Sequence, residues 1–388
     1  MFKIQTINKI ATIGLDCFDK SRFSISDSIQ NPDAILVRSA ALHAMDFSES
    51  VKAVGRAGAG VNNIPIEICT QRNIVVFNTP GANANAVKEM VLSSLFVASR
   101  NILGGVEYTR SLVGQGEKIH ELVEENKSRF KGAEIRGKKL GVVGLGSVGM
   151  MVANDAAALG MEVEGYDPFI SVSRAWELSR AVKPASSLSK MLSTCDFITL
   201  HMSLTADTKG LINAETLSKM KKEAVLLNFA RAEIVEDEAI IKALNNREIA
   251  LYVTDFPTDP LLKSPHTICI PHLGASTKEA EDNCAIMIAE QISDYLINGN
   301  ITNSVNFPNC STERNGDARL VIVNQNIPNM VGQITSILAA ENLNILEMVN
   351  KSRGNIAYNI VDITGQCTEA VLSRIKAVQG ITSVRLLS

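Results

Sequence analysis

One stretch constrains the fold more than any other: residues 139–167, which read KLGVVGLGSVGMMVANDAAALGMEVEGYD. An apolar run is followed by the pattern G-x-G-x-x-G, then by a segment of helix-forming residues and by a second apolar strand. This order predicts the start of a βαβ unit that binds a dinucleotide. In such a unit the first glycine makes a tight turn, the second lets the backbone approach a pyrophosphate, and the third allows helix and strand to pack closely. The three glycines are Gly144, Gly146 and Gly149.

The residues around this turn also predict which dinucleotide is bound. The expected helix begins at Val148, and the unpaired N–H groups at its start favour the pyrophosphate. Asp167 ends the second strand, where its carboxylate can accept hydrogen bonds from ribose hydroxyls and would repel a 2′-phosphate. The stretch therefore favours NAD over NADP. Glycines also occur together in ordinary turns, but an ordinary turn does not explain why a strand, a helix, a second strand and an acidic residue surround these glycines in that order.

Composition excludes several classes of protein. A chain of 388 residues is too long for one core, so two or three domains are expected. The net charge is -3 and the basic residues are spread along the chain, so we expect no nucleic-acid partner. The seven cysteines form no C-x-x-C pair, which favours a reducing cytoplasm. No apolar run approaches the roughly 18 residues that span a bilayer, so a soluble protein without a membrane partner is expected. The spacing of the histidines predicts no metal site.

The order of the remaining segments predicts an α/β fold of three domains. Residues 1–84 alternate short buried strands with helices, as in a small parallel-sheet domain. A long helix over residues 85–106 leads into the dinucleotide unit, and a second one over residues 275–298 can return the chain to the first domain. We therefore expect a doubly wound, Rossmann-type NAD domain (85–281) inserted in a smaller, flavodoxin-like substrate domain (1–84 and 282–307).

The last part of the chain predicts a separate unit. Residues 311–317 are polar and resemble a linker. The elements expected after it follow the order βαββαβ, which is typical of a ferredoxin-like domain over residues 318–388.

Three polar residues follow predicted strands of the NAD domain, at the sheet edge where ligands bind. Arg231 has the planar fork that suits a carboxylate, and the imidazole of His272 titrates nearest neutrality. Asp259 could orient that imidazole. Each also has an ordinary interpretation, as a solvated strand end or as turn chemistry before a proline. A serine hydrolase is not indicated, because the chain contains no G-x-S-x-G motif.

The motifs in combination resemble those of the D-isomer-specific 2-hydroxyacid dehydrogenases. The resemblance covers nearly the whole chain and includes GLGSVG with Asp167, then Asn-Phe-Ala-Arg at 228–231, Asp-Phe-Pro at 255–257 and Pro-His-Leu-Gly-Ala-Ser-Thr at 271–277. In the first domain it includes Val-Arg-Ser-Ala at 37–40, a Gly-rich stretch at 54–63 and Asn-Thr-Pro at 78–80. The C-terminal unit looks like an ACT domain.

The resemblance implies a role for each matching residue. Arg231 would bind the substrate carboxylate, and His272 would be the acid/base, paired with Asp259. The family usually has a glutamate at that position, one residue further from the arginine, so Asp259 departs from the pattern. The Gly-rich stretch lacks the helix and acid of a second nucleotide site. It is expected to contact a substrate carboxylate or phosphate through Arg38, Ser39, Arg56 and Gly58. The residues expected around NAD, besides the three glycines, are Ser147, Val148, Asp167, Phe229, Ala230, Arg231, Asp255 (near the carboxamide), His272, Leu273, Gly274 and Ala275.

The resemblance also implies an activity. The expected reaction is the reversible, NAD-dependent oxidation of a small phosphorylated 2-hydroxy acid, 3-phospho-D-glycerate, at the start of L-serine biosynthesis. Two alternatives stay open: a dehydrogenase of the glyoxylate/hydroxypyruvate or D-lactate type, and a non-catalytic, NAD-sensing protein like the corepressors of this family. We expect a homodimer or homotetramer. L-Serine, or another effector, is expected at Asn326 and Asn344, although Asn324 stands where the family usually has a histidine.

Overall fold

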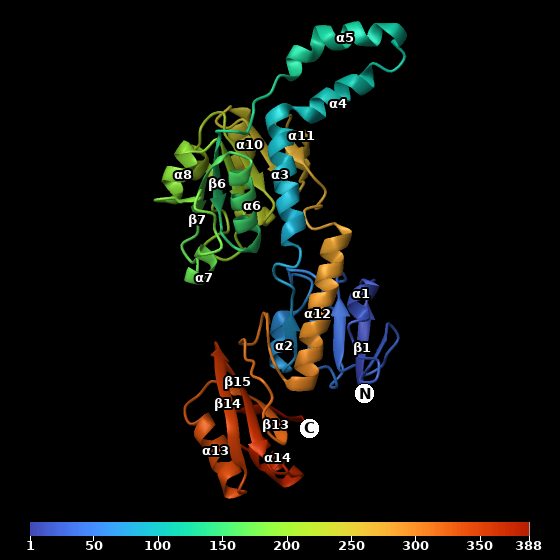
Figure 1. Ribbon diagram of the computed structural model, residues 1–388, viewed down its shortest axis with the longest axis vertical. Coiled ribbons are helices and arrows are strands. Elements are labelled where there is room, and N and C mark those ends of the chain that lie inside the picture. The colour runs from blue at the N-terminus through green and yellow to red at the C-terminus, as the bar shows by residue number, and fades with distance from the viewer. Residues whose placement is uncertain (388) are drawn as a thin grey trace. The chain divides into compact units, whose positions relative to one another are not determined.

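The computed structural model describes residues 1–387, which fold into two compact units (Figure 1). The first unit contains residues 1–83 and the chain from residue 278 onward, and the second unit contains residues 84–277. Each unit is built on a parallel sheet covered by helices, and the first carries an additional antiparallel sheet. The expected α/β class is confirmed. Among the described residues, no helix is both long and apolar enough to cross a membrane.

The second unit contains a doubly wound sheet of seven parallel strands in the order β12-β11-β10-β9-β6-β7-β8. The winding direction reverses between the adjacent strands β6 and β9, where a doubly wound sheet leaves a crevice at its carboxyl edge. Helices bury both faces, so the strand residues are almost all apolar. The strands are β6 (Lys139–Val143), β7 (Glu162–Tyr166), β8 (Lys183–Pro184), β9 (Phe197–Leu200), β10 (Val225–Asn228), β11 (Leu251–Thr254) and β12 (Thr267–Cys269).

The helices of this unit divide between the two faces of the sheet. One face packs against α3 (Ala84–Arg100) and α6 (Ser147–Ala158). The opposite face packs against α8 (Leu188–Thr194), α9 (Ala214–Leu217) and α10 (Asp237–Asn245). Two short helices, α7 (Val172–Ala175) and α11 (Asp259–Lys263), follow β7 and β11, and the 3-10 turn η3 (Ala232–Ile234) follows β10.

The long helix expected over residues 85–106 is interrupted at Asn101. This residue adopts a left-handed conformation with φ 46°, which asparagine tolerates better than most residues, and it ends α3. The chain continues as α4 (Ile102–Ser111) and α5 (Ile119–Asn126). We call residues 102–131 the arm. Neither helix of the arm contains a buried residue.

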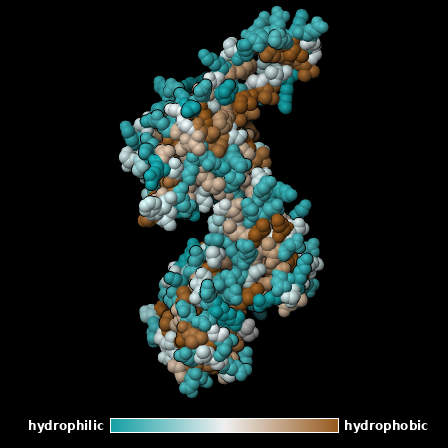
Figure 2. Space-filling model, viewed as in Figure 1, coloured by the Kyte–Doolittle hydropathy of each residue, from teal (hydrophilic) through white to brown (hydrophobic). Residues whose placement is uncertain are grey.

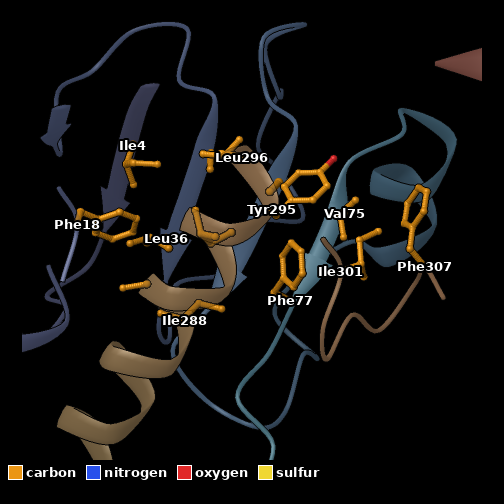
Figure 3. Close-up of a cluster of buried hydrophobic side chains, with 14 of the residues drawn as sticks. Ile4, Phe18, Leu36, Val75, Phe77, Ile288, Tyr295, Leu296, Ile301 and Phe307 are labelled. Carbon is orange, nitrogen blue, oxygen red and sulfur yellow. The ribbon is translucent and has the colours of Figure 1, made fainter. Parts of the chain in front are cut away.

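The first unit begins with a five-stranded parallel sheet in the flavodoxin-like order β2-β1-β3-β4-β5, as expected. The long helix α12 (Lys278–Asn298) returns the chain to this sheet and buries nine residues. Figure 3 shows its residues Ile288, Tyr295 and Leu296 packed with Leu36 and Phe77 of the sheet. The other elements are β1 (Phe2–Ile7), α1 (Thr12–Leu15), β2 (Phe23–Ser26), β3 (Ala34–Val37), β4 (Ala53–Arg56), α2 (Ile66–Gln71) and β5 (Val75–Phe77).

The C-terminal part has the expected βαββαβ order and an antiparallel sheet, β14-β15-β13-β16. One face of this sheet packs against its own two helices. The other face contributes Val321, Val323, Tyr358 and Ile360 to the same core as α12, so one core extends through both parts of the first unit. The elements are β13 (Ala318–Gln325), α13 (Met330–Ala340), β14 (Asn344–Arg353), β15 (Ile356–Thr364), α14 (Glu369–Lys376) and β16 (Ile381–Leu387).

Candidate active site

The Gly-rich turn connects β6 to α6 at the carboxyl edge of the seven-stranded sheet. Gly144 has φ +91°, a conformation that side chains rarely adopt. A Cβ atom at Gly149 would lie 1.9 Å from the carbonyl oxygen of Gly144, so only glycine fits. A Cβ atom at Gly146 would meet no atom within 4 Å, and no side chain caps the helix that begins at Ser147. The turn therefore offers open space beside unpaired N–H groups, which fits the pyrophosphate of a dinucleotide.

Asp167 follows β7 directly and lies beside the same turn. One of its carboxylate oxygens accepts a hydrogen bond from the Leu145 N–H at 2.9 Å, and the other accepts one from the Phe169 N–H at 2.9 Å. The carboxylate thus holds the Gly-rich turn against the end of β7. Carboxylate oxygens have further lone pairs, which can accept from ribose hydroxyls.

Arg174 is a cation near this turn that the motifs did not indicate. Its Nη1 atom lies 3.4 Å from the hydroxyl oxygen of Ser147 and donates to it. Arg174 is on α7, seven positions after Asp167, and no motif marks such a position.

The segment after β10 is shaped by a buried amide. Asn228 is fully buried, and its Nδ2 donates to the Arg231 carbonyl at 2.9 Å, while its Oδ1 accepts from the Ala230 N–H at 3.1 Å. These two bonds close the turn and leave the Arg231 side chain exposed at the edge of the sheet. Phe229 and Ala230 are buried beneath it. The turn-forming role of Asn228 was missed at the sequence level, because a polar residue at a strand end has no distinctive pattern.

The turn that contains His272 is held by Asp255, which follows β11 and is 3% exposed. The Asp255 carboxylate accepts from the N–H groups of Leu273 and Gly274, both at 2.8 Å. His272 adopts φ +53°, an uncommon conformation for a non-glycine residue. Its ring packs edge-on against Phe256 at 5.2 Å between centroids, and the side chain is exposed. A residue whose surroundings hold it in a strained backbone conformation is typical of functional sites.

The structure does not join Asp259 to His272. Asp259 is the first residue of α11, and its carboxylate, which is 78% exposed, pairs with Lys263 at 2.5 Å. No hydrogen bond between Asp259 and His272 is present among the described residues. A surface pair of this kind is weak and exchanges readily with water. The pairing of Asp259 with His272 stays a prediction.

Another histidine, His201, lies beneath the Gly-rich turn. Burial lowers the pKa of His201 to about 3, and its Nε2 atom lies 2.9 Å from the hydroxyl of Thr199. The ring is therefore neutral near pH 7.

In the first unit, Arg38 follows β3 at the carboxyl edge of the five-stranded sheet. Its Nη2 atom donates to the carboxylate of Glu281 on α12 at 2.6 Å, and the two side chains are 39% and 40% exposed. The neighbouring Ser39 is exposed. Arg38, one of the two arginines expected to bind an anion, thus already forms an ion pair with a carboxylate.

Arg56 stabilises the Gly-rich stretch after β4. Its guanidinium donates to the carbonyl oxygens of Arg38, at 3.0 Å, and of Gly60. Gly58 lies under this guanidinium, since a Cβ atom there would be 3.3 Å from Arg56 Cζ. Arg56 therefore fixes the loops after β3 and β4 relative to each other.

The two asparagines expected to bind an effector lie at opposite ends of the antiparallel sheet. Asn326 donates to the Gly354 carbonyl at 3.1 Å, beside the β14–β15 hairpin, whereas Asn344 begins β14 opposite Thr364. Nine residues of strand separate the two ends, a span of about 30 Å. Asn324, at the usual histidine position, is buried and accepts from Asn359 at 2.7 Å. One small ligand therefore cannot contact Asn326 and Asn344 of the same chain.

Comparison with known proteins supports the dinucleotide interpretation. Residues 98–274 match the family model described as D-isomer specific 2-hydroxyacid dehydrogenase, NAD binding domain. The D-3-phosphoglycerate dehydrogenase of Methanocaldococcus jannaschii is 34% identical over 346 residues, which cover 87% of this chain and 63% of that protein. That of Haemophilus influenzae is 31% identical over 347 residues, which cover 86% of this chain and 81% of that protein. The chain spans less than two thirds of the length of the M. jannaschii protein.

A solved structure shows the same fold. It is that of cofactor (NAD+) bound 3-phosphoglycerate dehydrogenase from Entamoeba histolytica, which is 28% identical and has a TM-score of 0.62. The match covers 79% of this chain and 98% of that one.

Proposed function

Because this chain belongs to the D-isomer specific 2-hydroxyacid dehydrogenase family, we propose that it catalyses the reversible, NAD-dependent oxidation of 3-phospho-D-glycerate to 3-phosphohydroxypyruvate. The observation that carries the proposal is the edge of the seven-stranded sheet. The Gly-rich turn after β6, Arg231 after β10 and His272 after β12 all lie at the carboxyl ends of parallel strands. Relatives named D-3-phosphoglycerate dehydrogenase support the choice of substrate.

The residues divide the chemistry as follows. Arg231 binds the substrate carboxylate through its two parallel N–H donors. In the oxidation, the neutral imidazole of His272 removes the proton from the C2 hydroxyl, and in the reduction the imidazolium returns it. NAD, when bound, supplies the acceptor for the hydride that leaves C2. Asp255 and Asn228 keep the His272 and Arg231 turns in place, through the hydrogen bonds described above.

The test is a panel of 2-oxoacids. NADH oxidation should be fastest with 3-phosphohydroxypyruvate, compared with hydroxypyruvate, glyoxylate and pyruvate at equal concentration. His272→Asn should lower kcat by about 100-fold or more and leave NADH binding unchanged, as is usual for the loss of a general acid–base residue. Asn228→Ala, which disturbs the turn without removing a reacting group, serves as the comparison.

One observation favours a second candidate, a dehydrogenase of the glyoxylate/hydroxypyruvate type. The Glu281 carboxylate on Arg38 neutralises a cation that a phosphate dianion would require. Faster NADH oxidation with hydroxypyruvate than with its phosphorylated form would select this alternative. No NADH oxidation with any 2-oxoacid, with NADH binding intact, would select the corepressor-like alternative.

We propose that the arm pairs two copies of the chain. Its exposed apolar side chains include Leu103, Val106 and Val113, and Figure 2 shows hydrophobic residues along it. A helix pair with no buried residue gains stability by covering this apolar surface with another chain. Sedimentation should give a dimer of the 41.9 kDa chain. Leu103→Glu with Val106→Glu should give monomer, whereas Val172→Glu, at an even more exposed apolar residue on α7, should not.

We also propose that the C-terminal unit responds to L-serine only in an oligomer in which the β14 strands of two chains pair. The edge strand β14 is largely exposed along its length. Antiparallel pairing of two β14 strands would bring the Asn326 end of one sheet beside the Asn344 end of the other. Serine should then lower the initial rate of the wild type but not of Asn344→Ala.

We also propose a cytoplasmic location, which the free thiols at all seven cysteines support.

A further inference from the structure

A cavity of about 520 Å³ lies within the first unit, and none of the residues expected to bind NAD lines it. One wall is the end of β14, with Lys351 and Arg353, and the other is formed by Asn78 after β5 and by Asn303 and Asn309 of the segment between α12 and the C-terminal unit. The volume is within the range of sites for small molecules.

The lining of this cavity carries positive charge without a counter-charge. Two of its residues are cationic and none is acidic. Neither Lys351 nor Arg353 forms an ion pair with a carboxylate among residues 1–387. The remaining polar residues include asparagine side chains, which donate hydrogen bonds through their amides.

The guanidinium of Arg353 is held in place rather than free to move. Its Nη1 atom donates to the carbonyl oxygens of Ser304, at 3.0 Å, and Phe307, at 3.4 Å. These bonds use one of three nitrogens and keep the others beside the cavity. A cation that is fixed before a ligand arrives loses less entropy on binding.

We propose that this cavity binds a small dianion, a metabolite that carries a phosphate or two carboxylates. Lys351 supplies a mobile charge and Arg353 a fixed, planar donor pair, which together match the oxygens of such a group. The asparagine amides satisfy the remaining oxygens. The site is distinct from the asparagines considered for serine, and it does not depend on the proposed reaction.

The cavity is connected to the Gly-rich stretch after β4. The Nδ2 atom of Asn78 donates to the Ala59 carbonyl at 2.6 Å, and the N–H of Thr79 donates to the Gly58 carbonyl at 3.1 Å. An anion that contacts Asn78 therefore restrains the loop that includes Gly58. Binding at the cavity is coupled to the order of this loop through two hydrogen bonds.

Hydrogen–deuterium exchange tests the proposal without any turnover. Inorganic phosphate and succinate, each added at 10 mM to the full chain, distinguish a phosphate from a dicarboxylate ligand. At least one of them should protect peptides that contain residues 350–355 and 301–309, together with residues 57–61. Protection by neither anion would overturn the proposal.

Variants locate the binding. Lys351→Ala should weaken the anion about tenfold, which is the usual loss for one charge-assisted hydrogen bond, and Lys351→Arg should restore it. Lys376→Ala, at an exposed lysine on α14, should behave as the wild type. Arg231→Ala should leave the protection of residues 350–355 intact. If Lys351→Ala keeps full protection, or if Arg231→Ala abolishes it, the anion binds elsewhere and the proposal fails.

Discussion

At the scale of single residues, burial separates two histidines of the same sheet edge. His201 lies beneath the Gly-rich turn, and burial lowers its pKa to about 3, whereas His272 is exposed on a strained turn. The His201 ring cannot gain a proton near neutral pH unless it leaves its buried position. Of the two, His272 alone is placed to exchange protons with a substrate.

The lowered pKa of His201 predicts how stability depends on pH. In the unfolded chain the ring has its ordinary pKa of about 6.5, so the unfolded state binds a proton first as the pH falls. Stability from this residue is therefore complete above pH 6.5 and is lost progressively between pH 6.5 and about 3, by roughly 1.4 kcal/mol per pH unit. Urea unfolding of the second unit should show this slope between pH 6.5 and 5.5 in the wild type, with little change between pH 7.5 and 6.5, and a smaller slope in His201→Asn. Equal slopes would mean that the pKa of His201 in the folded protein is the same as in the unfolded chain.

Glu281 predicts a change in substrate affinity, if the proposed function is correct. Removing its charge in Glu281→Gln frees Arg38 for the phosphate. The pair is half-exposed and hence worth at most about 1 kcal/mol, so the KM for 3-phosphohydroxypyruvate should fall about three- to fivefold with little change in kcat. Glu290→Gln, at an exposed position of the same helix, is the matched control. A higher KM in Glu281→Gln would instead show that Glu281 holds Arg38 in its binding position.

At the scale of elements, two glycines of the turn before α6 should affect different quantities, Gly146 the binding of NADH and Gly149 the stability of the fold. A Cβ atom at Gly146 enters open space, so Gly146→Ala should change the free energy of unfolding by less than about 1 kcal/mol but weaken NADH binding. A Cβ atom at Gly149 meets the Gly144 carbonyl, so Gly149→Ala should cost about 1–3 kcal/mol of stability. Urea unfolding and NADH fluorescence titration measure both quantities. Similar losses in the two variants would contradict the different surroundings of these glycines.

The elements also show what could be predicted from sequence. The βαβ unit and the βαββαβ order are visible because strands, glycines and acids recur at spacings that the backbone requires. The break at Asn101 was missed, because the apolar pattern continues across it and only the backbone conformation ends α3. The arm was missed for a related reason: neither of its helices buries a residue, so the apolar pattern of a helix packed on a core does not mark them.

Some residues of the candidate site could likewise be predicted from the sequence, and others could not. Arg231 and His272 could be identified because both follow predicted strands at one sheet edge. Partners distant in sequence could not: Glu281 lies 243 positions from Arg38, and only the return of α12 to the first sheet brings them together. The attachment of Asp255 to the His272 turn likewise depends on how two strand ends pack.

At the scale of the whole molecule, the buried guanidinium of Arg319 joins the C-terminal part to helix α12 of the first unit. Arg319 and Asp362 are 0% and 1% exposed and form two hydrogen bonds of 2.6 and 2.7 Å. The same guanidinium donates to the carbonyl oxygens of Asn298, at the end of α12, and of Glu313, both at 2.9 Å. A hydrogen bond and the shared core therefore both connect the antiparallel sheet to α12.

This arrangement predicts that the first unit unfolds as a single body. Asp362→Asn leaves the Arg319 guanidinium buried without its counter-charge, which should lower the free energy of unfolding by about 3–5 kcal/mol. Because the core is continuous, residues 1–83 and residues 318–387 should lose exchange protection at the same, lower urea concentration, while residues 84–277 keep theirs. Glu341→Gln, which removes the partner of Arg374 in a half-exposed pair of the same sheet domain, should cost less than about 1 kcal/mol. If Asp362→Asn unfolds residues 318–387 while residues 1–83 stay protected, the shared core does not couple them, and the C-terminal part is an independent domain.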